Sequence, residues 1–250
     1  MSENQKKIWI TGASSGIGKA VAEKFAKEGW KVAVSARRKE LLDELAKNPN
    51  VNSFPLDVTN RSQINEVFKN ITDEFGDLDL CLFSSGTYEP KDEQNIDPDK
   101  IKNVINVNFL GVIDCVKSVE DYFKNRRSGH ISIVSSIAGY RGLPNSSGYG
   151  PSKAALTNFS ESIYFDFKKF GVRVSVVSPG FIKTPLTDKN EFPMPFLKTP
   201  EYAAEKIFNG LIKGNAFEIH FPKGLTLTLK FLRILPYRLY LFLVDKLVKR

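Results

Sequence analysis

Cysteine is scarce in this sequence, and no long apolar run is free of charged residues and proline. Cys81 and Cys115 are the only two cysteines among 250 residues. They lack metal-ligand spacing and are too few for a disulfide framework, so a reducing cytosol is the simplest setting. We therefore predict a cytoplasmic protein without a metal site. The first residues lead into only a short apolar strand, so we expect no signal peptide.

Repeats, linkers and low-complexity segments are also missing. The fractions of hydrophobic (42%) and charged (26%) residues are ordinary for a globular protein. A net charge of +8 suits an anionic ligand, a nucleic acid or an anionic membrane surface. The first 220 residues contain no nucleic-acid motif and no basic run interleaved with aromatics, so we expect no nucleic-acid partner.

Short apolar runs alternate with amphipathic segments along most of the chain. We expect strands at 6–10, 31–35, 51–56, 79–83, 130–134, 172–177 and 217–221. Helices are expected at 19–28, 40–46, 61–75, 98–123, 149–170 and 200–212. This alternation predicts the α/β class: a single doubly wound (Rossmann) parallel sheet of about seven strands with helices on both faces.

A glycine pattern joins the first expected strand to the first helix. It reads Thr11-Gly12-Ala-Ser14-Ser15-Gly16-Ile17-Gly18. Glycines permit a tight turn and a close approach of the backbone, and the helix N-terminus offers free N–H groups to an anion. Ser14 and Ser15 add hydroxyl donors. The order strand, glycine turn, helix indicates a dinucleotide site; the alternative is a glycine-rich turn without a ligand.

The second strand ends in Ser35-Ala36-Arg37-Arg38, without the acidic residue that an NAD site usually carries there. Arg37 can form a bidentate contact with a phosphate. We therefore predict a preference for NADP(H). The alternative is that both arginines are merely solvated at a helix start, and it fits Arg38 better than Arg37.

The next two strand ends carry small or polar residues. Asp57-Val58 follows the third strand, and Asp57 either accepts from an adenine amino group or caps the next helix. Ser84-Ser85-Gly86 follows the fourth strand. A turn of small residues suits the floor of a cofactor cleft at the carboxyl edge of a parallel sheet.

Ser136, Tyr149 and Lys153 form the candidate reaction centre. Tyr149 and Lys153 are four residues apart, so a helix places them on one face. A free Tyr has a pKa of about 10, and a Lys ammonium one turn away favours the phenolate. Ser136 can hydrogen-bond the same substrate oxygen, so the set suits proton transfer at a carbinol oxygen. The alternative for the Tyr–Lys pair alone is an exposed helix surface.

Asn106 and Asn108 interrupt the apolar pattern of the long helix expected at 98–123. A buried amide must be hydrogen-bonded. An amide that kinks the helix or holds a water is a candidate relay, and a satisfied structural asparagine is the equal alternative. The segment 181–200, rich in proline and bulky apolar residues, is expected to form a mobile flap over a substrate pocket.

Taken together over residues 6–222, these motifs resemble the short-chain dehydrogenase/reductase family. The match rests on the glycine pattern and on further motifs in the family's order and spacing. These are Asp57-Val58, Asn106-Val-Asn108, Ser136, Tyr149-x-x-x-Lys153 and Pro179-Gly180-x-Ile182-x-Thr184.

The resemblance implies a catalytic set of Ser136, Tyr149, Lys153 and Asn108. Tyr149 is then the acid or base, Lys153 lowers its pKa and holds the nicotinamide ribose, and Ser136 polarises the carbonyl. Asn108 holds the water that links Lys153 to solvent. The implied cofactor contacts are Gly12, Ser14, Ser15, Gly16, Ile17, Gly18, Arg37, Arg38, Asp57, Val58, Ser84, Ser85, Gly86, Tyr149, Lys153, Pro179, Gly180, Ile182 and Thr184.

The implied function is an NADP(H)-dependent oxidoreductase that interconverts a ketone and a secondary alcohol. Its substrate is a small or lipid-like carbonyl compound, and the family implies a homodimer or homotetramer. One departure supports an alternative, a catalytically silent dinucleotide-binding regulatory or scaffold protein. The chain has Phe83-Ser84-Ser85-Gly86 where the family usually has Asn-Asn-Ala-Gly.

The C-terminal segment is the second departure from the family. We divide the chain into a catalytic domain, 1–223, and a helical extension, 224–250. Charged residues interrupt the apolar run of the extension and Pro236 breaks it. This argues against a bilayer span and predicts two amphipathic helices around Pro236. Three placements stay open: packing on the core, pairing with another subunit, or peripheral contact with an anionic membrane.

Overall fold

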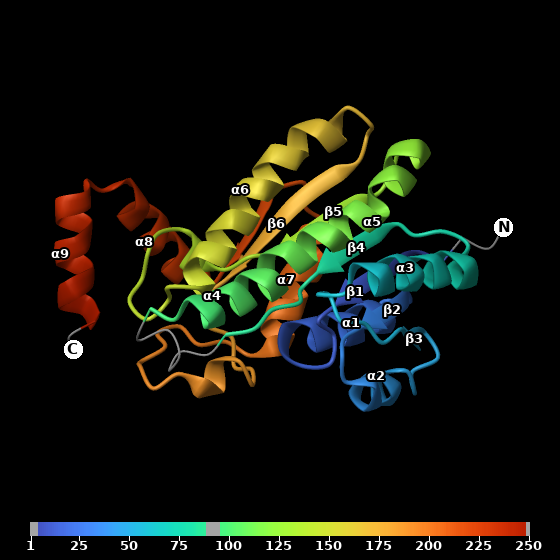
Figure 1. Ribbon diagram of the computed structural model, residues 1–250, viewed down its shortest axis with the longest axis horizontal. Helices are drawn as coiled ribbons and strands as arrows, with labels where there is room; N and C mark the ends of the chain where they lie inside the picture. The colour runs from blue at the N-terminus through green and yellow to red at the C-terminus, as the bar shows by residue number, and fades with distance from the viewer. Residues whose placement is uncertain (1–4, 89–95, 249–250) are drawn as a thin grey trace.

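The computed structural model describes residues 5–88 and 96–248, and its centre is one parallel sheet. The seven strands have the order β3-β2-β1-β4-β5-β6-β7 (Figure 1). They are β1 (Lys7–Thr11), β2 (Lys31–Ser35), β3 (Val51–Ser53), β4 (Leu80–Phe83), β5 (His130–Val134), β6 (Arg173–Pro179) and β7 (Glu218–Phe221). The strand order reverses direction between β1 and β4, which confirms the predicted doubly wound sheet.

Helices cover both faces of the sheet. They are α1 (Gly16–Lys27), α2 (Lys39–Leu45), α3 (Arg61–Phe75), α4 (Pro98–Ile105), α5 (Gly111–Arg126), α6 (Tyr149–Lys168) and α7 (Pro200–Ile212). Two further helices, α8 (Lys223–Ile234) and α9 (Tyr237–Val248), follow the last strand. The break between them at Leu235 and Pro236 confirms the two helices that the sequence predicted.

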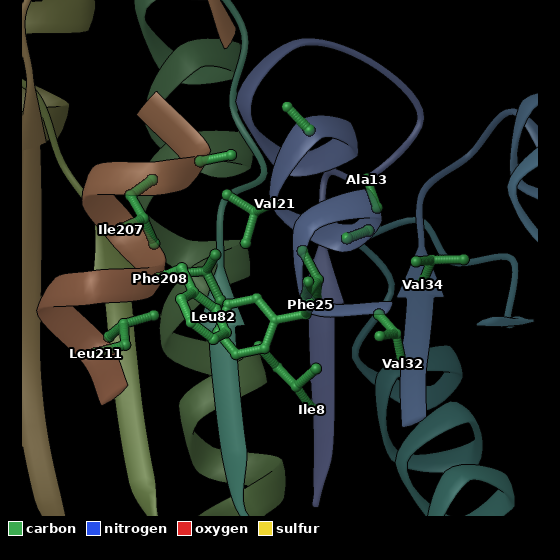
Figure 2. Close-up of a cluster of buried hydrophobic side chains, with 14 of the residues drawn as sticks. Ile8, Ala13, Val21, Phe25, Val32, Val34, Leu82, Ile207, Phe208 and Leu211 are labelled. Atoms are coloured by element: carbon green, nitrogen blue, oxygen red, sulfur yellow. The ribbon is translucent and has the colours of Figure 1, made fainter. Parts of the chain in front are cut away.

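Alternate residues of each strand face opposite helix layers, as the pleat requires. Ile8 and Ile10 of β1 pack in one cluster with α1 and α7, where Phe25 meets Phe208 at 4.9 Å between ring centroids (Figure 2). Trp9, between the two isoleucines, lies in the other cluster, with α3 and α5. Because both faces are covered, the strands are buried almost along their whole length.

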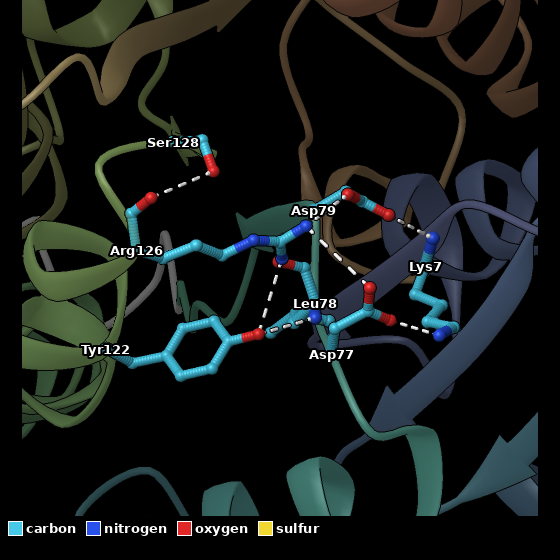
Figure 3. Close-up of polar contacts among 7 residues, drawn as sticks. All are labelled: Lys7, Asp77, Leu78, Asp79, Tyr122, Arg126 and Ser128. Atoms are coloured by element: carbon cyan, nitrogen blue, oxygen red, sulfur yellow. Dashed lines mark hydrogen bonds and ion pairs between the residues drawn. The ribbon is translucent and has the colours of Figure 1, made fainter. Parts of the chain in front are cut away.

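Polar contacts join β1, β4 and α5 at the amino edge of the sheet (Figure 3). The Lys7 N–H donates to the Asp79 carboxylate at 2.9 Å, and the Lys7 ammonium pairs with Asp77. Arg126 reaches Asp79 at 3.2 Å. The amide of Leu78 donates to the hydroxyl of Tyr122 on α5 at 2.9 Å. These contacts fix the sheet at the edge opposite the candidate site.

Two predicted elements differ clearly from the observed ones. The third strand ends at Ser53 rather than at 56, although the N–H groups of Phe54 and Leu56 still donate to the carbonyls of Val34 at 2.9 Å and Ala36 at 3.0 Å. The expected single helix at 98–123 contains a π-helical segment, η1 (Asn106–Leu110), between α4 and α5. The polar composition of 88–98 also predicts a loop there, and residues 89–95 of it lie outside the described residues.

Among the described helices, none is both long and apolar enough to cross a bilayer.

Candidate active site

A cleft of about 670 Å³ opens at the carboxyl edge of the sheet. It lies beside the switch point between β1 and β4, where ligands bind in open α/β sheets. Twenty of the twenty-one predicted site residues line it; Asn108 does not. They are Gly12, Ser14, Ser15, Gly16, Ile17, Gly18, Arg37, Arg38, Asp57, Val58, Ser84, Ser85, Gly86, Ser136, Tyr149, Lys153, Pro179, Gly180, Ile182 and Thr184, a set that includes every catalytic prediction but Asn108.

The glycine loop comes so close to neighbouring backbone that side chains are excluded. Gly12 has φ +71°, and a Cβ there would lie 2.7 Å from the carbonyl oxygen of Ser84. A Cβ at Gly18 would lie 2.4 Å from the carbonyl oxygen of Gly12. The loop therefore packs the start of α1 closely against the turn after β4. It leaves the N-terminus of α1 open to the cleft, as an anionic ligand requires.

Both arginines after β2 are exposed at the cleft. The Arg38 guanidinium donates to the hydroxyls of Ser14 at 2.9 Å and Ser15 at 3.0 Å. The sequence argument favoured Arg37 over Arg38 as the phosphate contact. The geometry instead joins Arg38 directly to the glycine loop, so both guanidinium groups belong to the same positive end of the cleft.

Asp57 is held as an anion beside these arginines. Its carboxylate accepts from the N–H of Thr59 at 2.9 Å and from the Thr59 hydroxyl at 2.8 Å. Burial raises the pKa of Asp57, but these hydrogen bonds and the charge of Arg37 outweigh burial and hold it below its usual value. The cap of α3 is Asn60, which accepts from the Gln63 N–H at 3.1 Å, so the helix-cap alternative for Asp57 is wrong.

The turn after β4 has Phe83-Ser84-Ser85 in place of Asn-Asn-Ala, and contacts other than asparagine amides hold it. The Phe83 side chain is fully buried and meets Trp9 edge-on, with ring centroids 5.5 Å apart. The Ser84 N–H donates to the buried Thr11 hydroxyl at 3.2 Å. The turn is thus braced by core packing and by a bond to β1.

Tyr149 and Lys153 lie one turn apart at the start of α6. The Lys153 ammonium lies 5.6 Å from the centroid of the Tyr149 ring and donates to the Val134 carbonyl at 2.9 Å. Lys153 is only 4% exposed. Its burial lowers the pKa of Lys153 from 10.5 to about 8, because desolvation disfavours the charged form. The ammonium therefore exchanges its proton close to neutral pH.

Ser136 follows β5 and begins the short helix η2 (Ile137–Gly139). Its hydroxyl oxygen accepts from the Ala138 N–H at 3.2 Å. The neighbouring Ser135 hydroxyl donates to the Lys153 carbonyl at 2.7 Å. The end of β5 is therefore tied to the Tyr149 helix, and Ser136 lines the same cleft as Tyr149.

Asn108 lies in η1, fully buried behind the cleft. Its side-chain oxygen accepts from the Thr87 N–H at 2.7 Å, and its amide donates to the Thr87 carbonyl at 3.0 Å and the Ser152 hydroxyl at 3.1 Å. Asn106 is exposed. Asn108 thus clamps the segment after β4 to the first turn of α6, and the helix deviates at this point through a π turn.

The segment expected to be a flap is tied at its base. The Lys183 N–H donates to the Lys198 carbonyl at 2.8 Å, and the Lys198 N–H donates to the Phe181 carbonyl at 3.0 Å. The Thr187 hydroxyl, in η3 (Thr187–Lys189), donates to the Ile182 carbonyl at 2.6 Å. These bonds fix the ends of the loop beside the cleft.

Sequence reasoning missed several lining residues. They are Ala36, Leu56, Thr87, Val107, Val134, Ser135, Pro185, Leu186, Thr187 and Lys189. Many stand next to a predicted site residue at a strand end, so extending each strand end by one or two positions would have found them. Tyr88, assigned to a polar loop, is buried with its ring centroid 4.8 Å from that of Tyr149.

Comparison with known proteins places this geometry in context. The family model described as short chain dehydrogenase matches residues 6–193. An uncharacterized oxidoreductase of Myxococcus xanthus is 34% identical over 236 residues, which are 92% of this chain and 93% of that protein. The 3-oxoacyl-(acyl-carrier-protein) reductase FabG of Thermotoga maritima is 36% identical over 185 residues, 72% of this chain and 75% of that protein.

Solved structures share the fold. A short-chain dehydrogenase from Streptomyces avermitilis superposes with a TM-score of 0.80 at 23% identity and covers 98% of both chains. ElxO with NADP bound gives a TM-score of 0.74 at 29% identity, over 86% of this chain and 97% of ElxO.

Proposed function

The chain belongs to the short-chain dehydrogenase/reductase family, and from this premise we propose that it is an NADP(H)-dependent reductase of an apolar ketone. Membership makes it an oxidoreductase that works with a nicotinamide dinucleotide. The proposal adds the choice of NADP(H), the roles of the site residues and the class of substrate. One observation carries it: Ser136, Tyr149 and Lys153 line one cleft together with the glycine loop.

The cleft residues fit a dinucleotide. The glycine loop excludes side chains where a pyrophosphate would approach, and Ser14 and Ser15 offer hydroxyl groups there. Arg37 and Arg38 give the adenosine end of the cleft a positive charge. Two guanidinium groups favour a ribose that carries a 2′-phosphate over one that carries a hydroxyl. This supports NADP(H), and ElxO, which is 29% identical, has NADP bound.

The reduced nicotinamide supplies the hydride when the cofactor is bound. Tyr149 donates its hydroxyl proton to the carbonyl oxygen of the ketone, which becomes the oxygen of the secondary alcohol. The Ser136 hydroxyl donates a hydrogen bond to the same oxygen and favours the charge that develops on it. The Lys153 ammonium, buried beside Tyr149, then returns a proton to the Tyr149 oxygen. In the oxidation direction each proton moves the opposite way.

Apolar residues that line the cleft support the proposal of an apolar ketone as substrate. Pro185 and Leu186 line the cleft from the loop after β6, beyond the residues assigned to the cofactor. A relative that is 36% identical is a 3-oxoacyl-(acyl-carrier-protein) reductase, whose name describes a ketone on an acyl chain. A 3-oxoacyl thioester is therefore the first substrate class to test, followed by simple ketones of increasing chain length.

The test is turnover of these ketones with NADPH and with NADH. We expect oxidation of NADPH by the native enzyme and a fall in kcat of about 10²–10⁴-fold in Tyr149→Phe, which keeps the ring and removes the proton donor. Cofactor binding by Tyr149→Phe, followed by fluorescence, should stay close to native. Native turnover in the Phe variant would remove Tyr149 from its assigned role.

A cofactor titration tests the arginines separately. NADPH should bind more tightly than NADH, and Arg37→Ala or Arg38→Ala should weaken NADPH about tenfold or more while changing NADH little. Lys47→Ala, an exposed cation at the end of α2, is the matched control and should change neither. Equal affinity of the native enzyme for both cofactors contradicts the NADP(H) preference.

The catalytically silent alternative draws its support from the substituted turn at Phe83-Ser84-Ser85. Because Phe83 packs in the core and Ser84 bonds to Thr11, the turn keeps its place at the cleft floor. The alternative predicts dinucleotide binding without turnover on any ketone, which the same substrate panel detects.

A further inference from the structure

The C-terminal helices α8 and α9 each have one apolar face that is buried and another that is exposed. On α8, the inward residues Leu225, Leu229 and Leu232 pack on other parts of the fold. The outward residues Leu227, Phe231 and Ile234 follow the same helical spacing and are 55%, 60% and 76% exposed. Each side of α8 is therefore apolar, and one side has no covering in the described part of the chain.

The second helix repeats this arrangement. Tyr240 and Val244 of α9 are buried against α8. Leu241 and Phe242 point away and are 60% and 54% exposed. Contiguous exposed apolar side chains on this scale mark a site of interaction rather than an ordinary surface.

Basic residues accompany the exposed apolar ones. Between residues 224 and 250 the sequence has six basic residues and one acidic residue. The basic ones are Lys230, Arg233, Arg238, Lys246, Lys249 and Arg250, and the acidic one is Asp245. Arg233 and Arg238 are exposed beside Ile234 and Leu239. Exposed apolar groups with neighbouring cations match the interface of an anionic lipid layer.

The same charge count argues against a second copy of this chain on this face. A symmetric dimer contact places one patch against itself. The exposed Arg233 and Arg238 of the two copies would then oppose each other around an apolar centre, and Asp245 is the single carboxylate in the sequence of 224–250 on each side. An anionic lipid surface satisfies both the apolar and the basic groups.

We propose that the outward face of α8 and α9, defined by Leu227, Phe231, Ile234, Leu241 and Phe242 with their basic neighbours, docks on an anionic phospholipid surface. The docking is peripheral, with the apolar side chains at the level of the headgroups and acyl chains and the arginines against phosphate.

This face lies next to the substrate side of the cleft. Leu225 of α8 packs with Ile137 and Tyr140, which closely follow Ser136 in the chain. The ring of Phe196, in the loop after β6, lies against the start of α8, 3.4 Å from the Cβ position at Gly224. Figure 1 shows α8 and α9 at the end of the molecule opposite the N-terminus. A docked enzyme therefore presents its cleft near the lipid surface.

Vesicle co-sedimentation of the full chain tests the proposal. We expect binding to phosphatidylcholine vesicles that contain phosphatidylglycerol, little binding to phosphatidylcholine alone, and weaker binding as salt is raised. Leu241→Asp should lower the affinity about tenfold or more, because a leucine that docking would bury among the lipids is replaced by a charge. Leu41→Asp, on α2, is the matched control and should bind as the native chain does.

The basic residues are tested by a second pair of variants. Arg233→Gln with Arg238→Gln should lower the affinity on the order of twentyfold, about fivefold for each cation. Lys27→Gln with Lys206→Gln removes the same charge from exposed positions on α1 and α7 and should have little effect.

Three results would overturn the proposal. One is the absence of binding to anionic vesicles. Another is an equal loss of binding in the tail variants and their controls. The third is a native dimer that Leu241→Asp converts to a monomer while no vesicles are bound, which assigns this face to a second copy. Dinucleotide binding, measured on the same samples, separates these outcomes from a failure of the proposed enzymatic function.

Discussion

At the scale of single residues, the burial of Lys153 links the candidate site to pH. Desolvation lowers its pKa in the folded protein from 10.5 to about 8. Between these values the unfolded chain holds a proton that the folded protein has lost, so the stability of the folded protein rises with pH across this window. The contribution is complete above about 10.5 and is lost as pH falls through about 8. We expect a rise of up to about 3 kcal/mol in the cofactor-free protein.

Lys153→Met supplies the comparison for this pH effect. Methionine has a similar shape and no proton to lose, so the slope in unfolding free energy between pH 8 and 10.5 should shrink in the variant. Urea unfolding at several pH values measures it. Parallel pH curves for the native protein and Lys153→Met would show that the slope comes from other groups.

The positions of the site residues were largely predictable from sequence, but their contacts were not. The glycine loop, Tyr149 and Lys153 follow short-range patterns that a sequence displays directly. The bonds from Arg38 to Ser14 and Ser15 join residues more than twenty positions apart, and only the folded sheet brings them together. Tyr88 carried no signal, because no periodicity marks an aromatic residue in a loop.

At the scale of elements, the π-helical segment η1 depends on Asn108. Asn108→Ala removes the partner of two Thr87 backbone groups and of the Ser152 hydroxyl. Because unpaired buried polar groups are costly, we expect the free energy of unfolding to fall by about 2–3 kcal/mol. Asn106→Ala, at an exposed position in the same segment, should change it by less than about 0.5 kcal/mol. Equal losses in the two variants would contradict the clamp.

The π-helical form of this segment could not be predicted from the sequence. Apart from Asn106 and Asn108, an apolar stripe runs from 98 to 123 and predicts one helix, and a single extra residue in one turn hardly alters a 3.6-residue period. The asparagines marked the place where the helix deviates, and the structure shows which of them holds the deviation.

Arg141 is the second prediction at this scale. Its guanidinium donates to the carbonyls of Leu232, Arg233 and Leu235 at the end of α8 and lies 4.0 Å from the centroid of the Tyr240 ring. Arg141→Ala should increase hydrogen exchange in α8 and α9 by about tenfold or more, since bonds to a charged group are each worth about 1.5–3 kcal/mol.

Arg61→Ala is the control for Arg141. Arg61 is an exposed arginine whose ion pair with Asp114 is 3.5 Å long, and its removal should leave exchange in α8 and α9 unchanged. Exchange in the two helices that is the same in Arg141→Ala and the native chain would contradict the capping role.

At the scale of the whole molecule, side-chain contacts join the C-terminal helices to the sheet and to the loop after β5. Lys230 of α8 pairs with Glu218 of β7, and Glu218 also accepts from the Tyr140 hydroxyl at 2.6 Å. We predict that the full chain unfolds in one calorimetric transition with equal calorimetric and van't Hoff enthalpies. A separate early transition would instead support the division at residue 223.

The sheet order and both helix layers were predictable because alternation of strands and helices leaves few topologies open. The association of the extension with the loop between Ser136 and Tyr149 was not predictable, since it depends on single long-range contacts. One is the hydrogen bond from the Tyr240 hydroxyl to the Gly142 carbonyl at 2.6 Å.

The contacts of Arg141 and Tyr240 also connect the loop after β5 mechanically to α8 and α9. The segment between Ser136 and Tyr149 is joined to α8 and α9 by Arg141 and by the Tyr240 hydroxyl. A load applied to α9 is therefore shared between β7, which leads directly into α8, and the loop that separates Ser136 from Tyr149. Part of any tension on the C-terminal helices therefore acts on the loop that carries the candidate site residues Ser136 and Tyr149.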